Sequence, residues 1–135
     1  MMMPDYKLED FQEIIDLFEM DVANKLDTAY IDDSGIPRLF LRGATVSTED
    51  ANELMLRLNY IKKELVIARI GFVHQRVGHG TRLLNMLTDF AKENGYEKIV
   101  LEAVSTEKMS SFAKKHGFKV FIDCPPQSFW EKSLI

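Results

Sequence analysis

Residues 70–81 read Ile70-Gly71-Phe72-Val73-His74-Gln75-Arg76-Val77-Gly78-His79-Gly80-Thr81, and the rest of the chain is arranged around this segment. An almost continuous apolar run, Glu64 to Phe72, leads into it with the length and β-branched content of a strand buried on both faces. Beyond it, apolar side chains recur at helical spacing over residues 80–94, and Gly95 can cap that helix. The sequence therefore predicts a strand, a glycine-bearing loop and the start of a helix.

The predicted loop has the features of an anion site. Gly78 and Gly80 let backbone N–H groups approach a ligand closely, and these amides lie at a helix N-terminus, where the macrodipole favours negative charge. Arg76, His79 and Arg82 add positive charge nearby. The implied ligand is a phosphate or pyrophosphate, and plain turn chemistry is the alternative reading of the two glycines. Neither the three-glycine dinucleotide fingerprint nor a Walker A motif occurs.

Three motifs in order resemble the GNAT N-acetyltransferase superfamily. Gln75-x-x-Gly78-x-Gly80, after an apolar strand and before a helix, resembles the Arg/Gln-x-x-Gly-x-Gly/Ala loop that holds the acyl-CoA pyrophosphate. Residues 98–104 look like the next strand of the family, and residues 111–118 look like the following helix, which ends in Gly-Phe. The resemblance covers about residues 64–134. It implies an α/β fold of the GNAT acyl-CoA N-acyltransferase type, with a mixed central sheet splayed at a bulged strand.

The resemblance also implies a co-substrate, acetyl-CoA, and the residues that bind it. In the family, a bulge splays the loop strand from its neighbour, and freed main-chain groups bind the pantetheine arm as an added strand would. Counting back from Gln75 gives Ile70 and Phe72 as those positions, and Gly71 between them is consistent with a bulge or a close backbone approach. Phe112 packs against the co-substrate or the core. The expected binding residues are Ile70, Phe72, Gln75, Arg76, Val77, Gly78, His79, Gly80, Thr81 and Phe112.

Glu64 is the catalytic candidate. Direct acetyl transfer to an amine needs a neutral amine, so a base must remove a proton from the ammonium group, directly or through water. In the histone-acetylating branch of the superfamily, the general-base glutamate stands at the same offset before the loop glutamine as Glu64 does before Gln75. A solvated charge at the start of a strand is the alternative reading. The implied function is acetyl transfer from acetyl-CoA to a primary amine on a small molecule or a protein lysine.

Two positions depart from the family pattern. Many members have a tyrosine general acid four residues before the glycine of the Gly-Phe motif, where this chain has Ala113, and Thr106 replaces the usual asparagine. These departures leave open a second function, a catalytically inactive GNAT-fold module that binds CoA or another protein. An unrelated nucleotide-phosphate binder is a third possibility, which fits the loop but not the later motifs.

The N-terminal half is predicted from periodicity alone. Residues 6–27 have the pattern of an amphipathic helix with acids on its outer face, residues 28–37 have turn chemistry, and residues 38–46 are predicted to form a strand. Ser47 and Asp50 then predict the cap of a second helix. Its apolar stripe is Ala51, Leu54, Met55, Leu58 and Ile61. Because the family has two or three antiparallel strands before the loop strand, this assignment implies a reduced or atypical N-terminal half, or a misread segment.

Length and composition set the class of protein. The 135 residues suit a single domain, residues 1–135, and the 46% hydrophobic and 28% charged content is ordinary for a globular protein. The net charge of -4 argues against nucleic-acid binding, and no segment is predicted to enter a membrane. A lone cysteine, Cys124, favours the reducing cytoplasm, and three histidines so placed predict no metal site. Residues 118–123 and 129–134 predict a terminal hairpin. A homodimer is one possibility that the sequence leaves open.

Overall fold

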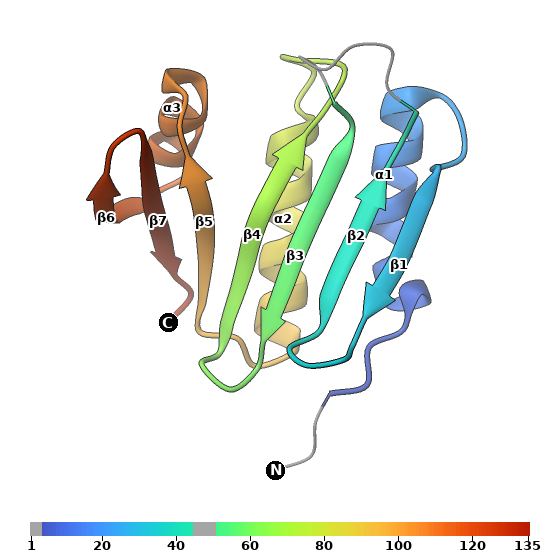
Figure 1. Ribbon diagram of the computed structural model, residues 1–135, viewed down its shortest axis with the longest axis horizontal. Coiled ribbons are helices and arrows are strands. Elements are labelled where there is room, and N and C mark those ends of the chain that lie inside the picture. Colours follow the sequence, from blue (N-terminus) through green and yellow to red (C-terminus); the bar gives the residue numbers. More distant parts are fainter. Residues whose placement is uncertain (1–3, 45–50) are drawn as a thin grey trace.

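One mixed sheet of seven strands runs through the protein, in the order β1-β2-β3-β4-β5-β7-β6 (Figure 1). The computed structural model describes residues 4–44 and 51–135. The helices and strands, in chain order, are η1 (Leu8–Phe11), α1 (Gln12–Val22), β1 (Thr28–Asp32), β2 (Arg38–Arg42), β3 (Glu53–Asn59), β4 (Glu64–Gly71), α2 (His79–Glu93), β5 (Lys98–Val104), α3 (Glu107–Lys115), β6 (Lys119–Cys124) and β7 (Gln127–Ser133). Neighbouring strands are antiparallel except β4 and β5, which are parallel. The predicted α/β class with a mixed central sheet is confirmed.

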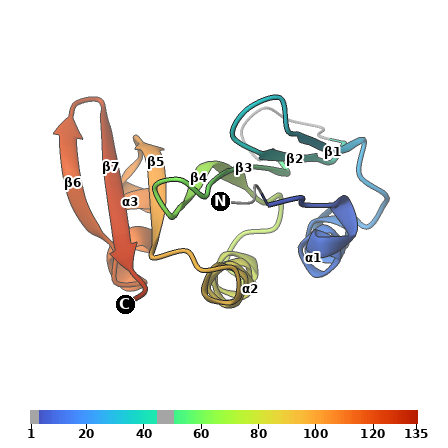
Figure 2. The ribbon, with the colours of Figure 1, turned by 90° about the horizontal axis from the view of Figure 1, so that it is seen from below.

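The helices leave one face of the sheet uncovered. Figure 2 shows α1 and α2 side by side on one face of β1 to β4, with α3 beside β5 and β7. Within the described residues, no helix covers the opposite face of β1 to β4, which we call the open face. The core lies between the strands and the helices, where Phe11, Phe18, Leu39, Leu56, Leu65, Leu83 and Leu87 are fully buried. No helix in the described part of the chain is long and apolar enough to cross a membrane.

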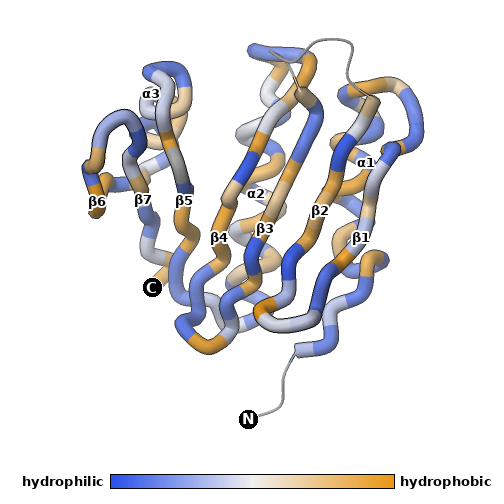
Figure 3. Tube along the Cα trace, viewed as in Figure 1, coloured by the Kyte–Doolittle hydropathy of each residue, from blue (hydrophilic) through white to orange (hydrophobic). Residues whose placement is uncertain are grey.

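The second helix predicted in the N-terminal half is wrong, because three of its five apolar residues, Leu54, Met55 and Leu58, belong to strand β3. Leu54, Leu56 and Leu58 are buried and alternate with half-buried neighbours, which is the two-residue period of a strand. Figure 3 shows apolar residues along the middle of β2, with a polar residue at each end, and the same alternation of burial occurs in β2. β3 pairs along its length with both β2 and β4. The segment was therefore misread, and the sheet before β4 is not reduced. The predicted cap, Ser47 and Asp50, lies outside the described residues.

Two further boundaries differ from the sequence prediction. Residues 28–32 form strand β1 rather than a loop, and they pair with β2 from Thr28↔Arg42 to Asp32↔Arg38. The first helix ends at Val22, well before residue 27, because Ala23 has φ 54° and leaves the helical conformation. The chain then turns through residues 23–27 into β1. Three antiparallel strands therefore precede β4 in the chain, and the third of them pairs with it.

The elements after β4 follow the predicted order. The α2 helix, the β5 strand, the α3 helix and the β6–β7 hairpin all occur, although α3 begins at Glu107 rather than near residue 111. The Thr106 side chain explains this earlier start, because its Oγ1 accepts the Met109 backbone N–H at 3.1 Å as an N-cap. The threonine that replaces the family asparagine therefore has a structural role here.

The parallel pairing of β4 and β5 stops partway along both strands. It runs from Glu64↔Lys98 to Ile67↔Leu101, whereas β4 continues to Gly71 and β5 to Val104. On its other edge, β4 has a bulge, because Leu56 pairs with Ile67 and Met55 pairs with Arg69. The extra residue between them is Ala68. The predicted splay at a bulged strand is confirmed, with the bulge three positions before Gly71.

Candidate functional site

The loop between β4 and α2 places the N-terminus of α2 at the splayed end of the sheet. Gly78 is the N-cap of α2 and has φ 86°, in the left-handed region that glycine adopts without strain. Among the described residues, no side chain caps this end. The first N–H groups of a helix have no acceptor within the helix, so those of His79, Gly80 and Thr81 are available to a ligand. The predicted anion site would use these backbone amides, and it stays a prediction.

The three residues before Gly78 shape the loop in different ways. The Gln75 side chain turns back and donates from Nε2 to the Phe72 carbonyl oxygen, which holds the loop to the end of β4. Arg76 has φ 62°, a conformation that costs a residue with a side chain some free energy. Val77 is 58% exposed, an unusual position for a branched apolar residue. Arg76 and Val77 thus present their side chains to solvent at the start of α2.

A buried carboxylate from α1 fixes the same loop. Asp21 is fully buried, and its Oδ2 accepts the Val73 N–H at 2.7 Å while its Oδ1 accepts the His74 N–H at 2.8 Å. The Asn52 amide, next to β3, donates to Oδ2 at 2.9 Å. One carboxylate therefore joins the first helix, the third strand and the loop, a contact absent from the sequence prediction, which had the acids of this helix on its outer face.

The contacts of Asp21 also set its ionisation. Burial, the largest single cause, raises the pKa of the carboxyl group. Hydrogen bonds from the Asn52 side chain, from the backbone of His74 and Val73, and from the His74 ring act in the opposite direction and together prevail. The pKa of Asp21 is therefore lowered from its usual value, and the group is a carboxylate at neutral pH. It provides a fixed negative charge behind the loop.

Two histidines meet this carboxylate from opposite ends of the loop. The His74 ring is largely exposed, and its Nδ1 lies 2.8 Å from the Asp21 carbonyl oxygen. His79, the first residue of α2, is buried against the Phe72 ring, with its Nε2 3.6 Å from Asp21 Oδ1. Its Nδ1 is buried and has no partner among the described residues. His79 therefore supports the helix start from inside the protein.

Helix α3 packs directly against the start of α2. A Cβ added to Gly80 would lie 2.8 Å from Cε1 of Phe112, so the glycine makes room for the Phe112 ring. Thr81 Oγ1 lies 3.3 Å from Nε2 of His116, whose ring is 4.6 Å from that of Phe112. Burial, and then the charges of neighbouring lysines, lower the pKa of His116. Phe112 therefore lies against Gly80 at the start of α2, and its predicted contact with a co-substrate stays a prediction.

The expected main-chain binding positions lie where β4 leaves β5. Ile70 is half-buried and lies beyond the last β4–β5 pair, Ile67↔Leu101. Phe72 follows the strand, is buried, and stacks on Phe18 of α1 with ring centroids 4.6 Å apart. Gly71 between them is a site of close approach, because a Cβ there would overlap the Ala51 carbonyl oxygen.

Glu64 lies at the opposite end of β4 from the loop. Its carboxylate is 3.6 Å from Lys98 Nζ, and the same ammonium group is 3.2 Å from Glu131. At about 3.3 Å per residue, the Cα of Glu64 is roughly 13 Å from that of Ala68 at the bulge. The structure therefore separates Glu64 from the loop and places it in an ion-pair cluster on the paired part of β4.

Sequence reasoning missed Asp21, Asn52 and His116. A signal for Asp21 was present, because it lies three residues after Phe18 and seven after Ile14, on the buried stripe of the helix. Asn52 gave no signal, because its side chain bonds to Phe18 and Asp21 on a helix far earlier in the chain. Among residues 4–44 and 51–135, no three His, Cys, Asp or Glu side chains are grouped to hold a metal ion.

Comparison with known proteins agrees with this geometry. Residues 73–118, from the loop to the end of α3, match the family described as Acetyltransferase (GNAT) family. Among curated proteins, none matches the chain. A proposed acyl-CoA N-acyltransferase from Klebsiella pneumoniae subsp. pneumoniae MGH 78578 superposes with a TM-score of 0.56 at 17% identity, over 96% of this chain and 94% of that one.

Two further solved structures share the same fold. Tetrahymena GCN5 gives a TM-score of 0.53 at 15% identity, over 73% of this chain and 69% of its own. Aminoglycoside 6'-acetyltransferase type Ii gives a TM-score of 0.51 at 18% identity, over 73% of this chain and 70% of its own. At these identities the likeness establishes the fold and not the acceptor. The resemblance found in the sequence is confirmed: the chain has the GNAT fold and carries a segment that matches the GNAT acetyltransferase family.

Proposed function

We propose that the protein is an acetyl-CoA-dependent N-acetyltransferase that moves an acetyl group to a primary amine by direct attack. The observation that carries this proposal is the coincidence of two features at one end of the sheet. Strand β4 leaves β5 after Ile67, and the same strand then runs into the uncapped N-terminus of α2. The GNAT fold and the family match over residues 73–118 support acyl transfer as the general reaction.

The residues at this end of the sheet fit the parts of acetyl-CoA. The amides of residues 78–81 and the charge of Arg76 would hold the pyrophosphate. The edge of β4 from Ala68 to Gly71 faces away from β3 and has lost its pairing with β5, so its main chain can bind the pantetheine arm. Phe112 of α3 lies against Gly80 at the start of α2, where it would pack beside the bound molecule.

The chemistry needs an acceptor amine without its proton. Acetyl-CoA supplies a reactive thioester, the amine nitrogen attacks the carbonyl carbon, and the carbon–sulfur bond breaks to release CoA. In this proposal the Ile70 amide region polarises the thioester carbonyl, and the protein's main contribution is orientation. Glu64 accepts the proton from the amine. Because it lies about 13 Å from the bulge along β4, we expect the proton to travel through water.

One observation favours the second candidate function, a GNAT-fold module without catalysis. Ala113, at the position where many members have a tyrosine, is fully buried in α3 and offers no proton donor to a leaving thiolate. A thiolate is a tolerable leaving group, so the substitution lowers rather than abolishes the expected activity. Binding of acetyl-CoA without turnover on any amine would favour this second candidate.

The proposed function is tested by thermal unfolding of the purified protein with and without acetyl-CoA, with ATP as the control nucleotide. Ligand at about a hundred times its dissociation constant should add roughly 2.7 kcal/mol, which raises the Tm by several degrees in a domain of this size. A rise with acetyl-CoA alone supports the proposal. No rise with acetyl-CoA, or an equal rise with ATP, would contradict it.

A further inference from the structure

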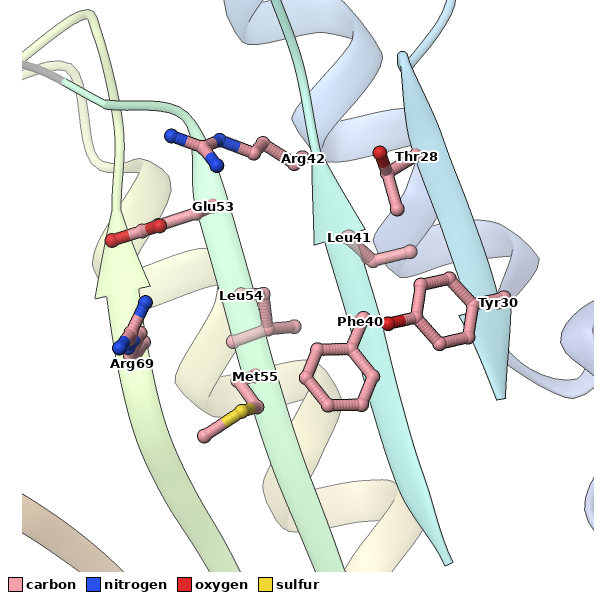
Figure 4. Close-up of a pocket in the computed structure, with 9 residues that line it drawn as sticks. All are labelled: Thr28, Tyr30, Phe40, Leu41, Arg42, Glu53, Leu54, Met55 and Arg69. Carbon is pink, nitrogen blue, oxygen red and sulfur yellow. The ribbon is translucent and has the colours of Figure 1, made fainter. Parts of the chain in front are cut away.

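The open face of the sheet carries a pocket beside the bulge of β4. The pocket has a volume of about 190 Å³ and spans β1 to β4 (Figure 4). Pockets for drug-sized ligands begin at roughly 300 Å³, so this one suits a small molecule or a single side chain. The residues that matter for the argument are Tyr30, Phe40, Arg42, Glu53, Met55 and Arg69.

The strand register explains why these side chains meet. Tyr30 pairs with Phe40, Phe40 with Met55, and Met55 with Arg69, so these four residues form one row across four strands on one face. Arg69 directly follows the bulge residue Ala68. The pocket therefore ends at the point where β4 parts from β5, about one strand spacing of 5 Å from the gap. A molecule in the pocket would lie beside the proposed thioester position.

The polar side chains of the pocket carry charges of both signs. Figure 4 shows the Glu53 carboxylate between the guanidinium groups of Arg42 and Arg69. Other arginines of the open face are engaged elsewhere: Arg38 lies 3.8 Å from Asp32, and Arg57 forms a bidentate ion pair with Glu102. The pocket thus combines one carboxylate, which attracts an ammonium group, with two guanidinium groups, which bind carboxylates in a forked geometry.

The rest of the pocket is apolar. The Tyr30 and Phe40 rings are stacked with centroids 4.9 Å apart and planes inclined by 16°, and they present a flat surface beside Met55. Tyr30 is 48% exposed, so this surface is accessible to a ligand. A flat or apolar group of the ligand can lie on it while the charged groups engage Glu53 and the arginines.

We infer that this pocket binds the acetyl acceptor, and that the acceptor is a small amine that also bears a carboxylate, with an apolar or aromatic side chain. A free α-amino acid such as phenylalanine or methionine has this chemistry. Polyamines and aminoglycosides are disfavoured, because two arginines repel a polycation and the pocket is small. The inference rests on the proposed function: the amine nitrogen attacks the thioester carbon, its proton goes to water or base, and CoA leaves as the thiol.

The test compares acceptors that differ only in the carboxylate. CoA release from acetyl-CoA is measured with phenylalanine and methionine, with their C-terminal amides, and with spermidine. We expect kcat/KM for each free amino acid to exceed that of its amide by at least tenfold. Arg42→Gln and Arg69→Gln should each reduce this ratio. Arg38→Gln, on the same face of β2 but outside the pocket, should leave the ratio unchanged.

Each other result overturns the inference in a distinguishable way. Equal or faster acetylation of the amides or of spermidine would exclude carboxylate recognition while leaving the proposed function intact. If acetyl-CoA binds but no acetyl group is transferred to either amino acid, the pocket does not bind these acceptors, and the proposed function still stands. Failure of the protein to bind acetyl-CoA, measured separately by the thermal shift, would overturn the proposed function and this inference together.

Discussion

The carboxylate of Asp21 accepts the backbone N–H of His74 at 2.8 Å, although the two residues are 53 positions apart in the chain. This bond joins the last turn of α1 to the loop that precedes α2. Buried polar groups are costly unless they are paired, so the carboxylate and the loop amides depend on one another. The position of the predicted phosphate loop is therefore set partly by the first helix.

Replacement of Asp21 by asparagine should destabilise the protein and weaken acetyl-CoA binding. Asparagine keeps the shape but loses the charge that strengthens the hydrogen bonds to the loop, so we expect the free energy of unfolding to fall by about 2 to 3 kcal/mol. Urea unfolding and calorimetric titration with acetyl-CoA measure the two effects. Asp16→Asn, an exposed change on the same helix, is the control. Equal stability of the two variants would contradict the role of Asp21.

The lowered pKa of Asp21 predicts acid sensitivity. Its folded pKa lies below the usual value near 3.9, so below about pH 5 the unfolded state binds more protons than the folded state. The stabilisation is complete above that range, and the free energy of unfolding falls as pH drops through the folded pKa. Urea unfolding between pH 3 and 7 should show a shallower decline for Asp21→Asn than for the unchanged protein. If the free energy of unfolding fell equally with pH in both proteins, Asp21 would not be a source of the acid sensitivity.

Gly80 and Phe112 should show energetic coupling. Alanine normally stabilises a helix relative to glycine by about 1 kcal/mol, but at Gly80 the added Cβ would force the Phe112 ring to move. We therefore expect Gly80→Ala to destabilise the protein and to be neutral or stabilising in a Phe112→Ala background. A double-mutant cycle by urea unfolding should give a coupling free energy of about 1 kcal/mol. Additive effects would show that the ring does not fill this space.

Arg76 should contribute charge, and not conformation, to cofactor binding. Its φ of 62° favours glycine, so Arg76→Gly relieves backbone strain while it removes the guanidinium group. We expect Arg76→Gly and Arg76→Ala to weaken acetyl-CoA binding to a similar extent. Only the alanine variant keeps the backbone strain at residue 76. Titrations at low and high salt should show the loss shrinking as salt rises. If the Arg76→Gly variant bound acetyl-CoA as tightly as the unchanged protein, the charge of Arg76 would have no role in binding.

Glu64 should matter for turnover and not for binding. Glu64→Gln removes the proposed proton acceptor, so kcat should fall by roughly a hundredfold or more while acetyl-CoA affinity is kept. The matched control is Glu131→Gln, because Glu131 shares the Lys98 ammonium group with Glu64. Similar losses in both variants would assign the effect to the ion-pair cluster. Unchanged turnover in Glu64→Gln would exclude Glu64 from the mechanism.

The sequence was informative where local pattern and final structure agree. The apolar run from residue 64 and the α2 stripe each have one reading, because burial on both faces of β4 and on one face of α2 leaves a plain periodicity. The region before β4 has no such plain periodicity. Residues 53–59 contain glutamate, leucine, methionine and arginine, which favour helices, yet they alternate as a strand, and pairing with β2 and β4 prevails over that local preference.

The parts of the site that depend on distant contacts could not be read from the chain. The bulge at Ala68 follows from the register with β3, and the pocket on the open face follows from four strands in register. Asp21 lies on the buried stripe of α1, but its partners come from a loop more than fifty residues later. The backbone loop was therefore predictable, whereas its support and the pocket on the open face were not.

The early end of the β4–β5 pairing limits the main-chain connection between two parts of the sheet. Four residue pairs join the leaf of β1 to β4 to the leaf of β5 to β7, and side-chain packing in one shared hydrophobic core connects the two leaves as well. Sparse main-chain bonds at a boundary favour subglobal opening, in which one leaf loosens while the other remains folded. A ligand bound along β4 would bridge the leaves and slow amide hydrogen exchange in β5 and β7, far from its own contacts. The open end of the β4–β5 boundary is therefore the place where a bound ligand is expected to change the local stability of the domain most.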